Sequence, residues 1–103
     1  MVIDGAIAQM ANSVRDNTAR NRFELDVDGA TAFADYRRSA DLVIITHTET
    51  PRPLRGRGIA TRLIEGAQRL IEADNRKMIA GCSFVADYLE KQSSRPEALR
   101  ETR

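Results

Sequence analysis

Cysteine and histidine are almost absent from this chain of 103 residues, which has one of each, Cys82 and His47. A single cysteine cannot form an internal disulfide, and one cysteine with one histidine cannot complete a structural zinc site. We therefore expect no bound metal. A chain without disulfides suits a reducing compartment, so we expect a cytoplasmic protein.

Long apolar runs are also missing. The run at residues 42–45 is far shorter than the roughly 20 residues that span a bilayer, and Asp4 lies where an export signal would be basic. The chain has only 6 Gly and 3 Pro, with 42% hydrophobic and 30% charged residues, which excludes disordered and collagen-like chains. We expect a protein that is neither exported nor inserted in a membrane.

The length is below the roughly 150 residues of an average domain, which excludes two domains. We expect a single domain over residues 1–103, in which residues 1–12 and 93–103 are flexible ends. We also expect a monomer or a weak dimer.

Positive charge is concentrated in one segment, although the formal net charge of the chain is only +1. Residues 51–70 hold five arginines against the single acid Glu65, so this segment carries +4 and the rest of the chain −3. The five are Arg52, Arg55, Arg57, Arg62 and Arg69. This distribution indicates an anionic ligand. A nucleic-acid-binding module is an alternative, which is disfavoured because no Phe or Tyr lies among these arginines.

Four segments have the composition and alternation of β-strands: residues 23–27, 31–37, 42–48 and 77–82. Asp28-Gly29 is typical of a hairpin turn, and Ser39-Ala40-Asp41 indicates a second turn. The segment at 42–48 is β-branched and apolar on both faces, so we expect it in the middle of a sheet that is covered on two sides.

Two segments are predicted to be helical. Residues 58–73 place Ile59, Leu63, Ala67, Leu70 and Ile71 on one apolar stripe, and Asp74-Asn75 ends the helix. A shorter helix is expected at about residues 84–92. The order of elements predicts an α+β or α/β layer fold, in which the strands before and after the long helix are parallel neighbours.

The segment Arg55-Gly56-Arg57-Gly58-Ile59-Ala60 joins the central strand to the long helix. Glycines let an anion approach the backbone, and the free amides at a helix start point outward with the positive end of the helix dipole. The segment therefore predicts a pyrophosphate site. A glycine-rich turn with solvated arginines is an equal alternative.

Arg55, Gly58 and Ala60 fill the pattern R-x-x-G-x-A, which resembles the acyl-CoA pyrophosphate motif of the GNAT superfamily of N-acetyltransferases. The resemblance covers about residues 13–92 and is closest to a subgroup of small single-domain members. It is carried further by Asn21-Arg22-Phe23-Glu24, Thr46-His47-Thr48-Glu49-Thr50-Pro51 and Cys82. The sequence departs from the subgroup at Gln92-Ser93-Ser94-Arg95-Pro96, which lacks a His-Pro segment.

The resemblance implies a minimal GNAT-like α+β fold, with a mixed, mostly antiparallel sheet, a long helix after the central strand and a short C-terminal helix. It implies an acetyl-CoA-dependent N-acetyltransferase that acts on a small-molecule or peptide amine. The strand ending at residues 47–49 would splay from the strand ending at Cys82, with the pantetheine arm in the gap. The implied cofactor-binding residues are Thr48, Arg55, Gly56, Arg57, Gly58, Ile59 and Ala60.

Four catalytic candidates follow, of which Cys82 is the first. Cys82 precedes the last helix, for which Ser83 is the expected cap, and a thiolate at a helix N-terminus is favoured electrostatically. His47 could accept its proton. Without the resemblance, Cys82 reads as a small buried hydrophobe and His47 as an ordinary strand residue.

Glu49 is a candidate base for the amine, or else a surface carboxylate paired with an arginine. Tyr88 is a candidate acid for the departing CoA thiolate, or else a packed aromatic residue. Arg76 or Lys77 could meet the adenosine 3′-phosphate, or simply follow the helix end. A CoA-binding protein without turnover is the remaining alternative.

Overall fold

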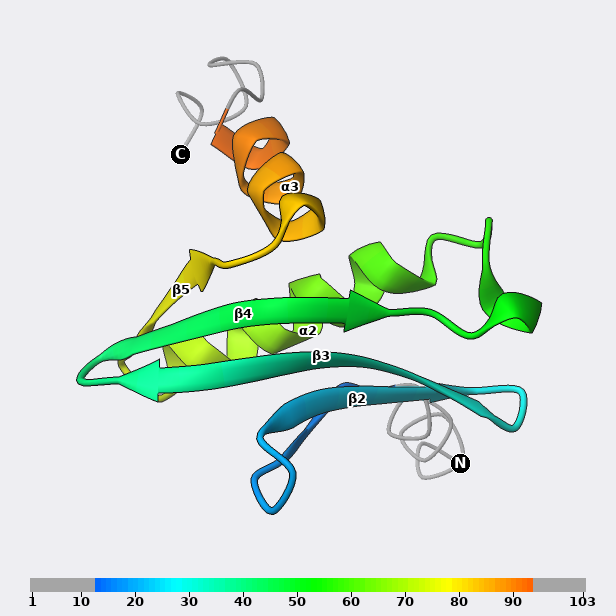
Figure 1. Ribbon diagram of the computed structural model, residues 1–103, viewed down its shortest axis with the longest axis horizontal. Coiled ribbons are helices and arrows are strands. Elements are labelled where there is room, and N and C mark those ends of the chain that lie inside the picture. The colour runs from blue at the N-terminus through cyan, green and yellow to red at the C-terminus, as the bar shows by residue number, and fades with distance from the viewer. Residues whose placement is uncertain (1–12, 94–103) are drawn as a thin grey trace, which may run out of the picture.

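The computed structural model describes residues 13–93 (Figure 1). Five strands form one sheet in the order β1 (Arg15–Asn17), β2 (Arg22–Val27), β3 (Ala30–Ser39), β4 (Leu42–Glu49) and β5 (Lys77–Ala80). A 3-10 helix, η1 (Arg52–Leu54), and two α-helices, α2 (Ile59–Ala73) and α3 (Ser83–Ser93), complete the described residues. Strands β1 to β4 are antiparallel neighbours, and β5 runs parallel to β4. The predicted α+β fold is confirmed.

Both predicted turns are present. Val27 pairs with Ala30, which leaves Asp28 and Gly29 as a two-residue turn with φ values of 50° and 81°. Left-handed backbone at both positions is the type I′ geometry that favours Asp-Gly. Ala40, with φ of 55°, occupies the corresponding turn between β3 and β4. The expected flexible ends lie outside the described residues, apart from Ser93, which is the last residue of α3.

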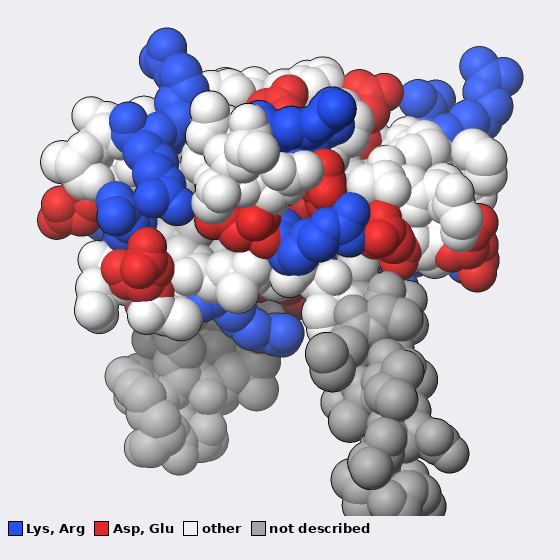
Figure 2. All heavy atoms as spheres, turned by 90° about the horizontal axis from the view of Figure 1, so that it is seen from below, with Lys and Arg blue, Asp and Glu red and all other residues white. Residues whose placement is uncertain are grey.

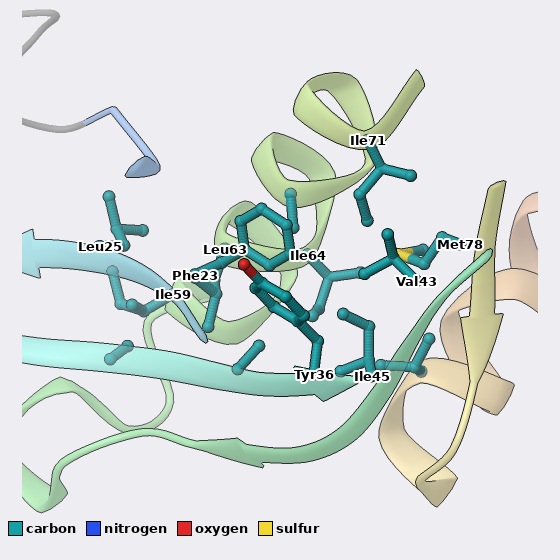
Figure 3. Close-up of a cluster of buried hydrophobic side chains, with 14 of the residues drawn as sticks. Phe23, Leu25, Tyr36, Val43, Ile45, Ile59, Leu63, Ile64, Ile71 and Met78 are labelled. Carbon is teal, nitrogen blue, oxygen red and sulfur yellow. The ribbon is translucent and has the colours of Figure 1, made fainter. Parts of the chain in front are cut away.

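Helix α2 packs its apolar face on one side of the sheet (Figure 3). The buried residues of the helix are Ile59, Leu63, Ile64, Ala67 and Ile71. They pack against Phe23, Leu25, Tyr36, Val43 and Ile45 of the strands, all of which are buried. The predicted stripe was wrong at Leu70, which is 38% exposed. Ile64 occupies the core in its place.

Strand β4 is buried on one face only, so the prediction that it is covered on both sides was wrong. Val43 and Ile45 are buried, whereas Leu42 is 36% exposed and Ile44 is half-buried. The physical reason is that α2 covers a single face, while α3 packs beside β5 (Figure 1). We refer to the face of the sheet opposite α2 as the open face.

The open face carries a buried carboxylate near β1, the short strand that the sequence pattern missed. Glu24 accepts hydrogen bonds from Asn17 and Arg22 and forms an ion pair with Arg15 at 2.7 Å. Burial by itself raises the pKa of Glu24, but the Asn17 hydrogen bond and the two arginines outweigh it and lower the pKa below its ordinary value. The network joins β1 to β2.

Candidate active site

The sheet splits where β4 continues past the end of β5. The two strands pair from Leu42 and Lys77 to Ile45 and Ala80, and the Gly81 N–H then donates to the Ile45 carbonyl at 2.8 Å. Beyond this bond the chain turns into α3, while β4 runs on to Glu49. Residues 46–49 thus have no β5 partner. The resemblance implied a splay at this end of the two strands.

A β-bulge in β4, just beyond the split, changes which residues of the strand point to each face of the sheet. Tyr36 pairs with Ile45 and Asp35 pairs with His47, so Thr46 is an extra residue. Because a bulge shifts the alternation of side chains by one residue, Thr48 follows Ile45 on the α2 side, where it pairs with buried Ala34. His47 and Glu49 consequently lie on the open face.

Cys82 lies at the start of α3 and contacts Thr48. Its Sγ atom is 3.6 Å from Oγ1 of Thr48, and its side chain is half-buried against the core. The Ala86 N–H donates to the Cys82 carbonyl, so Cys82 itself precedes the first helical residue. The expectation that Ser83 caps the helix was wrong, because Ser83 is already helical.

His47 contacts Glu49 instead of Cys82. Its Nε2 atom lies 2.9 Å from Oε1 of Glu49, and the two side chains are 56% and 44% exposed. The bulge at Thr46 is the reason, since it turns His47 away from the face on which Thr48 meets Cys82. The structure therefore does not bring together the expected pair of His47 and Cys82.

The glycine-rich segment forms an open groove at the start of α2. Gly56 and Gly58 have φ values of 77° and 72°, and a Cβ atom at either residue would meet no other atom within 4 Å. The groove measures about 240 Å³ and is lined by Thr50, Leu54, Arg55, Gly56, Gly58, Ile59, Ala60, Thr61 and Phe84. The first intrahelical bond runs from Arg62 N–H to the Gly58 carbonyl, so the amides of residues 59–61 have no intrahelical partner.

A family model described as GCN5-related N-acetyl-transferase matches residues 22–98. The chain belongs to this family. Among solved structures it is similar to the NMR solution structure of a GCN5-like protein from Staphylococcus aureus. That likeness has 29% sequence identity and a TM-score of 0.61, and it covers 82% of this chain and 83% of the other. No curated protein matches the chain.

The family accounts for the fold and for the class of reaction, acyl transfer to an amine. Its members generally use acetyl-CoA and act on small-molecule or peptide amines. Within residues 13–93, no helix is long and apolar enough to cross a membrane. The same described residues contain no cluster of acidic, histidine and cysteine side chains that could hold a metal ion.

The predicted basic segment does not form one surface of this GCN5-related protein. Arg55 lines the groove and donates from Nε to the Thr50 carbonyl at 2.9 Å. Arg57 instead pairs with Asp28 of the β2–β3 turn, also at 2.9 Å. Arg62 and Arg69 line a separate hollow beside Val14. Figure 2 shows a face on which the two signs of charge are interspersed.

Tyr88 lies in a second hollow, between α2 and α3. Its hydroxyl donates to Oε1 of Gln68 at 3.1 Å and lies 3.3 Å from Nε2 of Gln92. Tyr88 follows Cys82 by six positions, which corresponds to about 9 Å along the helix axis. The structure thus brings Tyr88 to the two glutamines and not to Cys82. The sequence offered no signal for Gln68 beyond its place outside the apolar stripe.

Arg76 lies at the far end of α2, where it contacts Asp74 and the Ala40 carbonyl. The 15 residues of α2 separate it from the groove by about 22 Å. Arg76 and Lys77 thus lie far from the groove, and their contact with the adenosine 3′-phosphate stays a prediction. These residues follow the end of the helix.

We predict that Gly81→Ala destabilises the protein at the split. The added Cβ would lie 2.7 Å from the Ile45 carbonyl oxygen and 2.9 Å from Cγ2 of Ile44. Because one contact is with backbone, β5 must move away from β4. We expect a loss of about 1 to 3 kcal/mol in urea unfolding, typical of overpacking. The double variant with Ile44→Ala should not recover it, and unchanged unfolding of Gly81→Ala would show that the close approach is dispensable.

Proposed function

We propose that this chain binds acetyl-CoA and transfers its acetyl group to an amine. The observation that carries the proposal is the position of the groove. It begins at the start of α2, where Gly56 and Gly58 expose the backbone, and Thr50 in its lining directly follows the part of β4 that leaves β5. A phosphate-bearing chain bound at the start of α2 would therefore place its reactive end toward Thr50 and the end of β4.

The start of α2 supplies the chemistry that a pyrophosphate requires. The amides of Ile59, Ala60 and Thr61 offer donors at the positive end of the helix dipole. The guanidinium of Arg55 is held at the groove by the Thr50 carbonyl. Its terminal nitrogens would add charge-assisted hydrogen bonds to phosphate oxygens.

At the split, Thr48 and Cys82 would lie beside the acetyl thioester. Acetyl-CoA supplies an activated acyl group, and this chain would orient it and handle the protons. The 3.6 Å contact allows the Thr48 hydroxyl to donate to Sγ of Cys82 when that sulfur is a thiolate. We include Cys82, Glu49 and His47 among the catalytic candidates. For Tyr88, the contact with Gln68 favours a structural role in the α2–α3 hollow.

The proposal is tested by incubating the full chain with acetyl-CoA and a panel of small amines and short peptides. Mass spectrometry would detect the acetylated product, and a thermal melt would detect CoA binding. A shift in the melt with no product from any amine would favour a CoA-binding protein without turnover. No shift and no product would contradict the proposal.

Arg55 and Arg57 provide a matched pair of variants. We predict that Arg55→Ala weakens CoA binding about 10-fold, because it removes charge-assisted bonds to phosphate. Arg57→Ala should change the affinity by less than about 2-fold, because its guanidinium pairs with Asp28 outside the groove lining. Titration calorimetry measures both. Each variant should unfold within about 0.5 kcal/mol of the wild type, and equal losses of affinity would contradict the distinction.

A further inference from the structure

The open face of the sheet is partly apolar and unevenly charged. We propose that a second copy of this chain binds to it face to face, related by a two-fold axis that runs across the strands. Figure 1 looks onto this face, with α2 behind the strands. Within residues 13–93, α2 covers the opposite face and α3 packs beside β5. The open face is also separate from the groove at the start of α2.

The apolar part of the open face lies where β4 pairs with β5. The core-facing residues of both strands are buried, so the alternate residues Leu42, Ile44 and Ile79 point to the open face. Leu42 is 36% exposed. Ile44 and Ile79 are half-buried and are direct register partners. Apolar side chains that adjoin on a surface favour contact with another protein surface.

The end of the open face that holds these apolar residues is basic. Arg37 of β3 pairs with Ile44, and Lys77 of β5 pairs with Leu42. Both cations are exposed, and the strand residues that face the open side at this end carry +2. Asp41 lies beyond them, in the turn between β3 and β4.

The opposite end of the open face is acidic. Four carboxylates of the strands face the open side there, against two arginines, so this end carries −2 with His47 neutral. Arg15 and Arg22 pair with two of the carboxylates. Among residues 13–93, Asp35 forms no ion pair, and Glu49 pairs only with His47. The four carboxylates are Glu24, Asp26, Asp35 and Glu49.

This distribution of charge selects one orientation for the second copy. Two identical faces that stack about a two-fold axis form an isologous contact. An axis that runs across the strands reverses their direction, so the basic end of each copy meets the acidic end of the other. An axis along the strands would place like charges against each other, which costs several kcal/mol in an interface.

The register of the strands then places individual residues opposite one another. Arg37 and Asp35 occupy adjacent rows of the open face, because they lie two residues apart on β3. With the axis between these rows, Arg37 of each copy lies against Asp35 of the other. Ile44, in the row of Arg37, lies next to the axis in both copies. Burial of the apolar residues stabilises the contact, and the charges fix its orientation.

Sedimentation velocity of the full chain tests the association itself. We expect an equilibrium between monomer and dimer that shifts toward the monomer as NaCl is raised from about 0.05 M to about 0.5 M, because salt screens the charges. A chain that stays monomeric at all concentrations up to about 1 mM would overturn the proposal. A dimer whose Kd does not respond to salt would do so as well.

A charge exchange tests the orientation. Arg37→Glu and Asp35→Arg should each raise the Kd of the dimer by about 10-fold or more, because each places like charges face to face. The double variant should return to within about 3-fold of the wild type. Arg69→Glu makes the same charge change on the exposed side of α2 and should leave the Kd unchanged. Losses that add in the double variant would overturn the two-fold arrangement.

Two leucines of matched exposure test which face makes the contact. Leu42 on the open face is 36% exposed, and Leu70 on α2 is 38% exposed. Leu42→Lys should raise the Kd of the dimer by about 10-fold, since it adds a cation to the basic end and removes apolar area, whereas Leu70→Lys should not. A dimer that is sensitive to Leu70→Lys alone would place the contact on α2 and overturn the proposal.

The dimer and the proposed acetyltransferase function can fail separately. Neither Leu42 nor Arg37 lines the groove, so their variants should keep the CoA-induced shift in melting temperature. A chain that dimerises as described and does not bind CoA would contradict only the proposed function. A chain that binds CoA and stays monomeric would contradict only the dimer.

Discussion

Coenzyme A is expected to raise the melting temperature of the wild-type chain and to leave that of Gly58→Val unchanged. A ligand at 100 times its Kd adds about 2.7 kcal/mol, which corresponds to a shift of roughly 10 °C for a domain of this size. Gly58 has φ of 72° and lines the groove at the start of α2. Valine is strained in this backbone conformation, and its side chain would project where the phosphates are expected to lie.

Gly29→Val is the matched control for backbone strain. Gly29 has φ of 81° and, like Gly58, no atom within 4 Å of an added Cβ, but it lies in the β2–β3 turn. Both variants should lose stability without ligand, and only Gly58→Val should lose the response to CoA. A wild-type melt that does not respond to millimolar CoA would contradict the cofactor assignment. So would a full response in Gly58→Val.

Local signals in the sequence were enough to predict most of the fold. The Asp28-Gly29 turn depends on two adjacent residues, and the apolar stripe of α2 depends on helical spacing within a single segment. Both can therefore be predicted from residues that are close together in the sequence. Strand β1 was missed because three residues, Arg15–Asn17, are too few to show alternation. Its ion pairs with β2 provide a stabilisation that no local pattern reveals.

The arrangement of the candidate site was harder to predict, because it depends on the extra residue Thr46 in β4. Strict alternation along β4 would put His47 on the same face as Ile45, and the bulge at Thr46 puts Thr48 there instead. The bulge is a property of the pairing with β3, so the sequence of β4 alone does not show it. The same limit applies to Tyr88, whose partner Gln68 lies 20 residues away on another helix.

The mechanism divides into two routes that differ in whether Cys82 becomes acetylated. In the covalent route its thiolate attacks the thioester carbon, a C–S bond to Cys82 forms, and CoA leaves as a thiolate. The amine then takes the acetyl group in a second step. In the direct route the amine attacks acetyl-CoA itself. Sγ of Cys82 contacts Thr48 beside the end of β5, at the start of α3, and this position is what would let it reach the thioester in the covalent route.

We therefore expect Cys82→Ala to lower acetyl transfer by about 100-fold or more while the CoA-induced shift in melting temperature is retained. Intact-mass spectrometry after mixing the wild type with acetyl-CoA, without amine, should show one added acetyl group, and digestion should locate it on Cys82. Added amine should remove it at the turnover rate, because a true intermediate cannot react more slowly than the whole reaction. Full activity in Cys82→Ala would instead establish direct transfer, with Cys82 as a wall of the gap between β4 and β5.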